Sequence, residues 1–134
     1  MIETELHLPI RPYDVDVAGI VSNIVYVRWL EDLRMELFST AFPPAALREN
    51  KLMPVIVRTE INYRASLRFS DRCTGRMRVV EVGRTSVTLD AAFLNERGET
   101  AAEAKQVSVF VDTAIGRPAP LPDEVRALLL KSDR

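Results

Sequence analysis

The sequence is short of the residues that most often carry out protein chemistry. It contains one histidine, His7, and one cysteine, Cys73, among 134 residues. A single cysteine cannot form a disulfide within the chain, and a lone histidine far from Cys73 disfavours Ser-His or Cys-His catalysis. No cluster of residues has the spacing of a metal site, and no glycine loop has that of a phosphate site. Any chemistry must therefore be carried out by carboxylates and backbone donors.

The sequence also lacks an excess of one charge and a long apolar run. Eighteen basic residues balance nineteen acidic ones, for a net charge of -1, which removes the electrostatic argument for a nucleic-acid partner. No apolar run approaches the ~20 residues of a membrane helix, and no signal peptide precedes the first polar strand. We therefore expect a single domain, residues 1–134, in the cytoplasm and without a membrane partner.

Hydrophobic periodicity predicts an α+β fold. The one long helical pattern has Asn23 as its N-cap and continues to about residue 40, followed by a turn over residues 45–50. A second, short helix is expected over residues 123–131. A period of two predicts five strands, at residues 3–13, 57–64, 73–82, 85–95 and 100–112. The order predicts one helix packed against an antiparallel sheet whose last four strands form a meander.

The second of these strands has a clear alternation. Apolar and polar positions predict one buried face, made of Val57, Thr59, Ile61 and Tyr63. The opposite face would then be exposed to solvent.

The segment from Tyr13 to Arg34 combines two carboxylates with a helix start. Asp14 and Asp16 lie in a turn near Gly19, shortly before the long helix. The first amides of a helix have no partners within it and carry a partial positive charge, so they suit an oxyanion or a polarised carbonyl. Two interpretations are open at this point: the carboxylates form the turn only, or one of them does chemistry beside the helix start.

The same segment resembles the motif of the 4-hydroxybenzoyl-CoA thioesterase-like branch of the hot-dog family. That motif begins Asp-x-Asp-x-x-Gly and continues into the first turns of a helix. The matching residues are Asp14, Asp16, Gly19, Val21, Asn23, Tyr26, Trp29, Glu31 and Arg34. Downstream, residues 63–65 and 83–86 resemble two further family segments, and the match extends over about residues 5–115.

The resemblance implies a hot-dog fold, in which a curved antiparallel sheet of about five strands wraps a long helix. It implies homodimers or homotetramers with active sites at the dimer interface. The implied activity is hydrolysis of an acyl-CoA thioester to free acid and CoA. No cofactor is implied, because coenzyme A is part of the substrate.

The resemblance also assigns roles to individual residues. Asp16 is the implied catalytic carboxylate, Gly19 belongs to the catalytic turn, and the backbone amide at Asn23 polarises the thioester carbonyl. The expected contacts of the substrate are Ser22, Tyr26, Tyr63, Arg84, Thr85 and Ser86. Of these, Arg84 is the first candidate to hold the CoA phosphates, with Arg64 and Arg68 as further candidates.

Several alternatives stay open from the sequence. Asp16 either attacks the carbonyl directly or deprotonates a water. The same fold serves non-catalytic acyl-CoA binding or sensing modules, and related thioesterases act on acyl carrier protein. Many relatives carry a bulky aromatic residue where Ser22 and Asn23 stand, so their small side chains argue against an aromatic acyl group.

Overall fold

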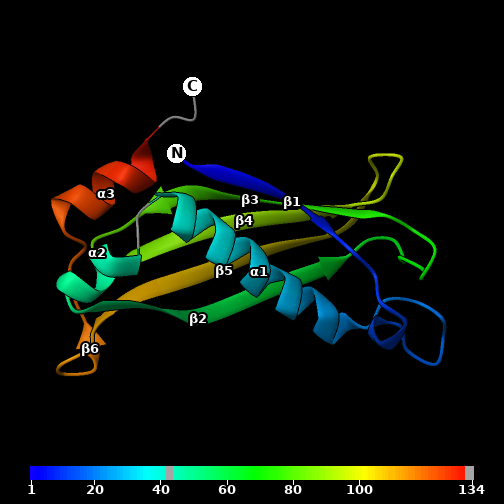
Figure 1. The fold of residues 1–134 in the computed structure, drawn as a ribbon, viewed down its shortest axis with the longest axis horizontal. Coiled ribbons are helices and arrows are strands. Elements are labelled where there is room, and N and C mark those ends of the chain that lie inside the picture. Colours follow the sequence, from blue (N-terminus) through cyan, green and yellow to red (C-terminus); the bar gives the residue numbers. More distant parts are fainter. Residues whose placement is uncertain (42–43, 132–134) are drawn as a thin grey trace.

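A single antiparallel sheet and one long helix dominate the structure (Figure 1). This computed structural model describes residues 1–41 and 44–131. The elements in chain order are β1 (Glu3–Leu8), the 3-10 helix η1 (Pro12–Asp14), α1 (Asn23–Ala41), α2 (Pro44–Glu49), β2 (Leu52–Tyr63), β3 (Cys73–Val82), β4 (Ser86–Leu94), β5 (Thr100–Asp112), β6 (Arg117–Pro118) and α3 (Asp123–Leu130).

Helix α1 crosses one face of the sheet diagonally (Figure 1). It forms because its 19 residues contain no proline or glycine and repeat apolar side chains at helical spacing. Leu30, Leu33 and Leu37 are fully buried against the sheet. The helix begins at Asn23, one residue earlier than predicted, so Ser22 occupies the N-cap position instead.

The strand order is β1-β3-β4-β5-β2, and every neighbouring pair is antiparallel. The predicted four-strand meander is therefore wrong at β2, which pairs with β5 and not with β3. Residues 64–72 explain the difference, because they do not fold back as a hairpin. Instead, Arg68 pairs with Ile20 and the Leu67 carbonyl accepts the Val21 amide at 2.7 Å, so this segment binds the turn before α1.

Strand β2 departs from the predicted alternation. Its register with β5 shifts between Ile56 and Arg58, and the bulged Val57 between them is 61% exposed. The prediction that Val57 shares a buried face with the next three alternating residues is wrong, because a bulge resets the alternation. Those three residues share a face opposite alternate residues of β5, in the pairs Thr59–Gln106, Ile61–Ala104 and Tyr63–Ala102. This face is not buried as predicted, because β2 is the edge strand: Thr59 and Tyr63 are exposed and Ile61 is part-exposed.

The other boundaries mostly match the predictions. Strands β3 and β5 have the predicted limits, whereas β1 ends at Leu8 because Pro9 and Pro12 lead into η1. The predicted turn over residues 45–50 is mostly helical, because α2 starts at Pro44, a residue suited to the first helical position, and continues with strong helix formers.

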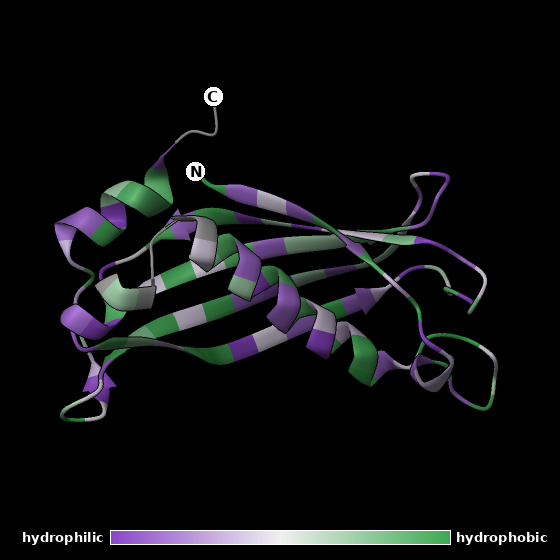
Figure 2. Cartoon of the chain, viewed as in Figure 1, coloured by the Kyte–Doolittle hydropathy of each residue, from purple (hydrophilic) through white to green (hydrophobic). Residues whose placement is uncertain are grey.

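The core lies between α1 and the inner face of the sheet. Hydropathy alternates along the strands (Figure 2), and the buried leucines of α1 are Leu30, Leu33 and Leu37. Near the start of α1 the rings of Tyr26, Trp29 and Phe93 pack with centroids 5.2 to 5.8 Å apart. This is the α+β arrangement of a helix wrapped by a curved sheet, as predicted.

Candidate active site

Asp16 projects from a tight turn between η1 and α1. The Asp16 amide donates to the Ile20 carbonyl at 2.9 Å, and the Gly19 amide donates to the Asp16 carbonyl at 3.0 Å. Gly19 has a φ of 78°, a conformation that costs other residues energy. The Asp16 side chain is exposed; its Oδ1 accepts the Ala18 amide at 2.8 Å, and its Oδ2 accepts no hydrogen bond from any described residue. One carboxylate oxygen is thus available for chemistry.

Asp14, two residues earlier, has a different environment. Its side chain is 6% exposed, its Oδ2 accepts the Arg11 amide at 2.8 Å, and its Oδ1 forms an ion pair with Arg28 Nη2 at 3.2 Å. Its main-chain carbonyl accepts the Ser22 amide at 2.9 Å. These bonds join η1, the turn and α1, so Asp14 holds the site together and has little capacity left to react.

The start of α1 offers free donors beside Asp16. The Val25 amide donates to the Ser22 carbonyl at 3.0 Å, whereas the amides of Asn23 and Ile24 have no acceptor within the described part of the chain. Asp16 and Asn23 both line a pocket of about 380 Å³. Its lining residues are Asp16, Ile20, Val21, Asn23, Tyr26, Tyr63, Arg64, Ala65 and Ser66.

Two tyrosines form an aromatic wall of this pocket. The rings of Tyr26 and Tyr63 meet edge to face with centroids 5.5 Å apart, and the Tyr63 hydroxyl lies 3.5 Å from the Asn23 carbonyl oxygen. Burial, with smaller contributions from Cys73 and Tyr63, raises the pKa of Tyr26 above its usual range. Its phenol therefore stays protonated and acts as a wall, while Tyr63 is 52% exposed at the mouth.

The structure brings together only part of the predicted site. Four predicted residues, Asp16, Asn23, Tyr26 and Tyr63, line the pocket; Gly19 and Ser22 shape the turn behind it. The predicted segment Arg84–Ser86 lies elsewhere. Ser86 pairs with Val109, seven residues along β5 from the Ala102 that faces Phe93 and Tyr63, or about 24 Å at strand spacing.

Sequence reasoning missed most of the opposite wall, which is made by the chain after β2. The Arg64 and Ala65 amides both donate to the Ala101 carbonyl, which holds this wall on β5. Arg64, predicted only as a phosphate ligand, also pairs with Glu103 through its guanidinium. The family-like Tyr-Arg-Ala segment at 63–65 was the one sequence signal for this wall.

The residues of other catalytic classes are not assembled. Cys73 is fully buried, and burial raises the pKa of its thiol to about 12, so it is not a thiolate at neutral pH. His7 lies on β1, paired with Thr74. Within residues 1–41 and 44–131, no group of three His, Cys, Asp or Glu residues could hold a metal ion. In the same ranges, no helix has the length and apolar character needed to cross a bilayer.

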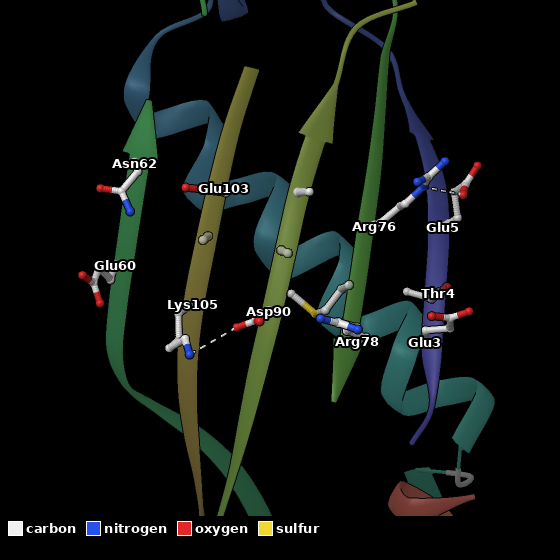
Figure 3. A pocket seen from close by; sticks show the side chains of 14 residues that line it. Glu3, Thr4, Glu5, Glu60, Asn62, Arg76, Arg78, Asp90, Glu103 and Lys105 are labelled. Atoms are coloured by element: carbon white, nitrogen blue, oxygen red, sulfur yellow. Dashed lines mark hydrogen bonds and ion pairs between the residues drawn. The ribbon is translucent and has the colours of Figure 1, made fainter. Parts of the chain in front are cut away.

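A larger hollow, of about 840 Å³, lies on the outer face of the sheet with α1 behind it (Figure 3). Two ion pairs join charged side chains of its lining. Arg76 pairs with Glu5 at 2.9 Å, and Lys105 Nζ lies 3.6 Å from Asp90 Oδ1. This hollow has no carboxylate beside free helix amides, so we do not place the chemistry there.

Comparison with known families identifies the superfamily of the chain. The thioesterase-like superfamily matches residues 10–129, which include Asp16, the whole of α1 and every main strand except β1. The chain belongs to this superfamily. Its class of activity is therefore thioester hydrolysis, as predicted.

Individual relatives support the assignment along most of the chain. The long-chain acyl-CoA thioesterase FadM of Escherichia coli (strain K12) is 24% identical over 126 residues, covering 93% of this chain and 96% of FadM. A thioesterase from Thermus thermophilus, solved with coenzyme A and Zn, is 29% identical with a TM-score of 0.82, covering 93% of this chain and 90% of that one.

A third relative confirms the fold at lower identity. Slr0204, a 1,4-dihydroxy-2-naphthoyl-CoA thioesterase from Synechocystis, has a TM-score of 0.86 at 16% identity, covering 98% of both chains. The predicted hot-dog fold is therefore confirmed over nearly the whole chain.

Proposed function

We propose that this protein hydrolyses acyl-CoA thioesters, with Asp16 as the catalytic carboxylate. The observation that carries the proposal is the shared pocket of Asp16 and the start of α1. One Asp16 oxygen and the amides of Asn23 and Ile24 lack partners among the described residues. The substrates named for FadM and the coenzyme A bound to the Thermus thermophilus enzyme support this choice of thioester.

The pocket suits the charge that develops during thioester hydrolysis. The carbonyl oxygen becomes negative, and the free amides of Asn23 and Ile24 would stabilise it; one such donor typically contributes about 2.7–4 kcal/mol. Asp16 then has two routes. It attacks the carbonyl carbon, expels the CoA thiolate and leaves a mixed anhydride that water hydrolyses, or it takes the proton of an attacking water. Both routes require only the carboxylate and the donors, so we propose that no bound cofactor takes part.

The walls of the pocket would hold the acyl group. Tyr26 and Tyr63 present ring edges and faces, while the small Ser22 behind Asn23 leaves room near the carbonyl. We propose that the acyl group packs against this aromatic wall.

We further propose that a second copy completes the site. In the sheet described, β2 has a neighbour on one side only, so its other edge presents unpaired backbone groups. Beside it, α1 exposes Ile24, Val27 and Met35. Antiparallel pairing of β2 with its own copy reverses the strand direction and brings the second copy's Arg84 turn toward Asp16. This would explain why the Arg84–Ser86 segment lies far from Asp16 within one chain. The dimer or tetramer and the cytoplasmic location stay predictions.

The test is thiol release from a panel of acyl-CoAs by the wild type and by Asp16→Asn. The substitution keeps the size of the side chain and removes the charge, so kcat should fall by roughly 10²- to 10⁴-fold. Asp90→Asn, taken from the outer hollow, is the matched control and should keep wild-type turnover. Wild-type rates in Asp16→Asn would refute the role of Asp16.

The same panel separates the enzyme from its alternatives. Tight acyl-CoA binding by calorimetry without thiol release would indicate a sensing module. Faster hydrolysis of acyl-loaded carrier protein than of the matching acyl-CoA would indicate that the carrier-bound thioester is the substrate.

A further inference from the structure

A chain of polar side chains links α1 to the edge of the sheet, away from Asp16. Arg34 Nη1 donates to Gln106 Oε1 at 3.0 Å, and Gln106 Nε2 donates to Thr59 Oγ1 at 3.0 Å. Gln106 is 2% exposed, Arg34 is half-buried, and Thr59 is exposed on β2. This series of hydrogen-bonded side chains therefore connects the core to the surface.

The direction of these hydrogen bonds is forced by chemistry. A guanidinium can only donate, so the oxygen of the Gln106 amide must face Arg34 and its nitrogen must face Thr59. Thr59 Oγ1 accepts that bond, which leaves its own hydroxyl hydrogen free to donate. The series thus presents donors on both sides of the Gln106 amide: the Thr59 hydroxyl at the surface and the unused N–H groups of the half-buried Arg34.

Arg34 is one of two half-buried arginines among the described residues, the other being Arg126. It forms no ion pair with any carboxylate in the described ranges and makes a single hydrogen bond. Arg126, also half-buried, instead donates to the Gly83 and Arg84 carbonyls and so closes the β3–β4 turn. Burial lowers the pKa of Arg34 and the nearby Glu31 carboxylate raises it, but an arginine remains charged. A half-buried cation with unused donors favours an anionic acceptor.

The donors lie in line with the proposed active site. Tyr63 lines the Asp16 pocket, and Thr59 faces the same side of β2 four residues earlier, about 13 Å away at strand spacing. The residue between them on this face of β2 is apolar: Ile61 is part-exposed. We name this surface, from Tyr63 past Ile61 to Thr59, the β2 strip. An extended chain gains about 1.2 Å per bond, so about ten bonds span it.

We propose that Arg34 and Thr59 bind a carboxylate at the far end of the acyl chain. The preferred substrates are then acyl-CoAs of about ten carbons that end in a carboxylate instead of a methyl group. This inference rests on the proposed acyl-CoA thioesterase function. The β2 strip holds the methylene groups, and the guanidinium and hydroxyl bind the two carboxylate oxygens.

The experiment compares decanoyl-CoA with its ω-carboxy counterpart, decanedioyl-CoA. In the wild type, kcat/KM should be at least about tenfold higher for the carboxylate-ended chain, the effect of one charge-assisted hydrogen bond. Arg34→Met should abolish this preference and leave kcat/KM for decanoyl-CoA within about twofold of the wild type. Arg34→Lys, which keeps the positive charge but lacks the planar guanidinium and its paired N–H donors, should retain part of the preference.

Two further variants separate recognition from folding. Thr59→Val removes only the surface hydroxyl and should reduce the preference by about threefold. Arg58→Met is the matched control, because Arg58 precedes Thr59 on β2 and pairs with Glu60 at 3.4 Å. It removes the same charge and should leave the preference unchanged.

Each contrary result has a distinct meaning. Hydrolysis of decanoyl-CoA without any preference overturns this inference but leaves the proposed function intact. An unchanged preference in Arg34→Met, with a weakened dimer, would show that Arg34 binds a carboxylate of a second copy instead. If neither substrate is hydrolysed, the proposed function fails. Calorimetric Kd values for the two ligands then test the inference alone, with equal values refuting it.

Discussion

The outer hollow and the Asp16 pocket differ in what their polar groups do. The outer hollow is about 840 Å³ against about 380 Å³ for the pocket. Yet among the described residues it has no helix start beside its carboxylates, whereas Asp16 keeps an oxygen free beside unpaired helix amides. Size and charge therefore do not identify the site. The combination of a free carboxylate oxygen with unpaired helix amides does, because folding does not need these groups there.

The two regions also differ in how they are supported. The pocket is backed by the packed rings of Tyr26, Trp29 and Phe93, whereas the outer hollow has the two alanines Ala91 and Ala92 of β4 beneath it. Rigid aromatic packing holds the start of α1 where the donors are needed. The following predictions test this difference with neighbouring residues on opposite faces of one strand.

The largest effect is expected from Phe93→Ala. Phe93 is fully buried and packs on Tyr26 and Trp29, so the cavity should lower the free energy of unfolding by about 3–5 kcal/mol. Leu94→Ala, the next residue and half-buried on the outer face, should cost about 1 kcal/mol or less. Urea unfolding of both variants measures the difference, and equal losses would contradict the idea of a specially supported pocket.

An intermediate effect is expected from Tyr63→Ala. Tyr63 lines the pocket, whereas the preceding Asn62 lines the outer hollow. Loss of the aromatic wall should lower kcat/KM for acyl-CoA by about tenfold. Asn62→Ala is the matched control and should retain full activity. A larger loss of kcat/KM in Asn62→Ala than in Tyr63→Ala would show that the active site lies on the outer face of the sheet, contrary to our proposal.

The smallest effect is expected from Arg76→Met on the outer face. Its ion pair with Glu5 is exposed on both sides, with side chains 60% and 58% exposed. Solvent screens such pairs, so the free energy of unfolding should change by about 0–1 kcal/mol and thioesterase activity should not change. A clear loss of activity would show that the outer hollow contributes to function after all.

Much of the fold follows from local patterns. The limits of β3 and β5 and the run of α1 are predictable, because period-two and helical apolar spacing persist over long segments. The bulge at Val57 and the pairing of β2 with β5 are not predictable in this way. Both depend on partners distant in sequence, such as Leu67 with Val21, whose energies no local window contains.

Some features of the candidate site are likewise predictable from the sequence, and others depend on the tertiary structure. The sequence by itself predicted that the chemistry uses a carboxylate, and its resemblance to the family motif singled out Asp16 in the turn before α1. The tertiary structure supplied the physical difference between Asp14 and Asp16, because that difference is one of burial and partners and not of residue type. It alone joined Tyr63 to the pocket, moved Arg84 away from it and aligned Arg34 with Thr59 through Gln106. Side chains from separate strands and helices meet only when the sheet has its final order and register, and that order is a property of the whole chain.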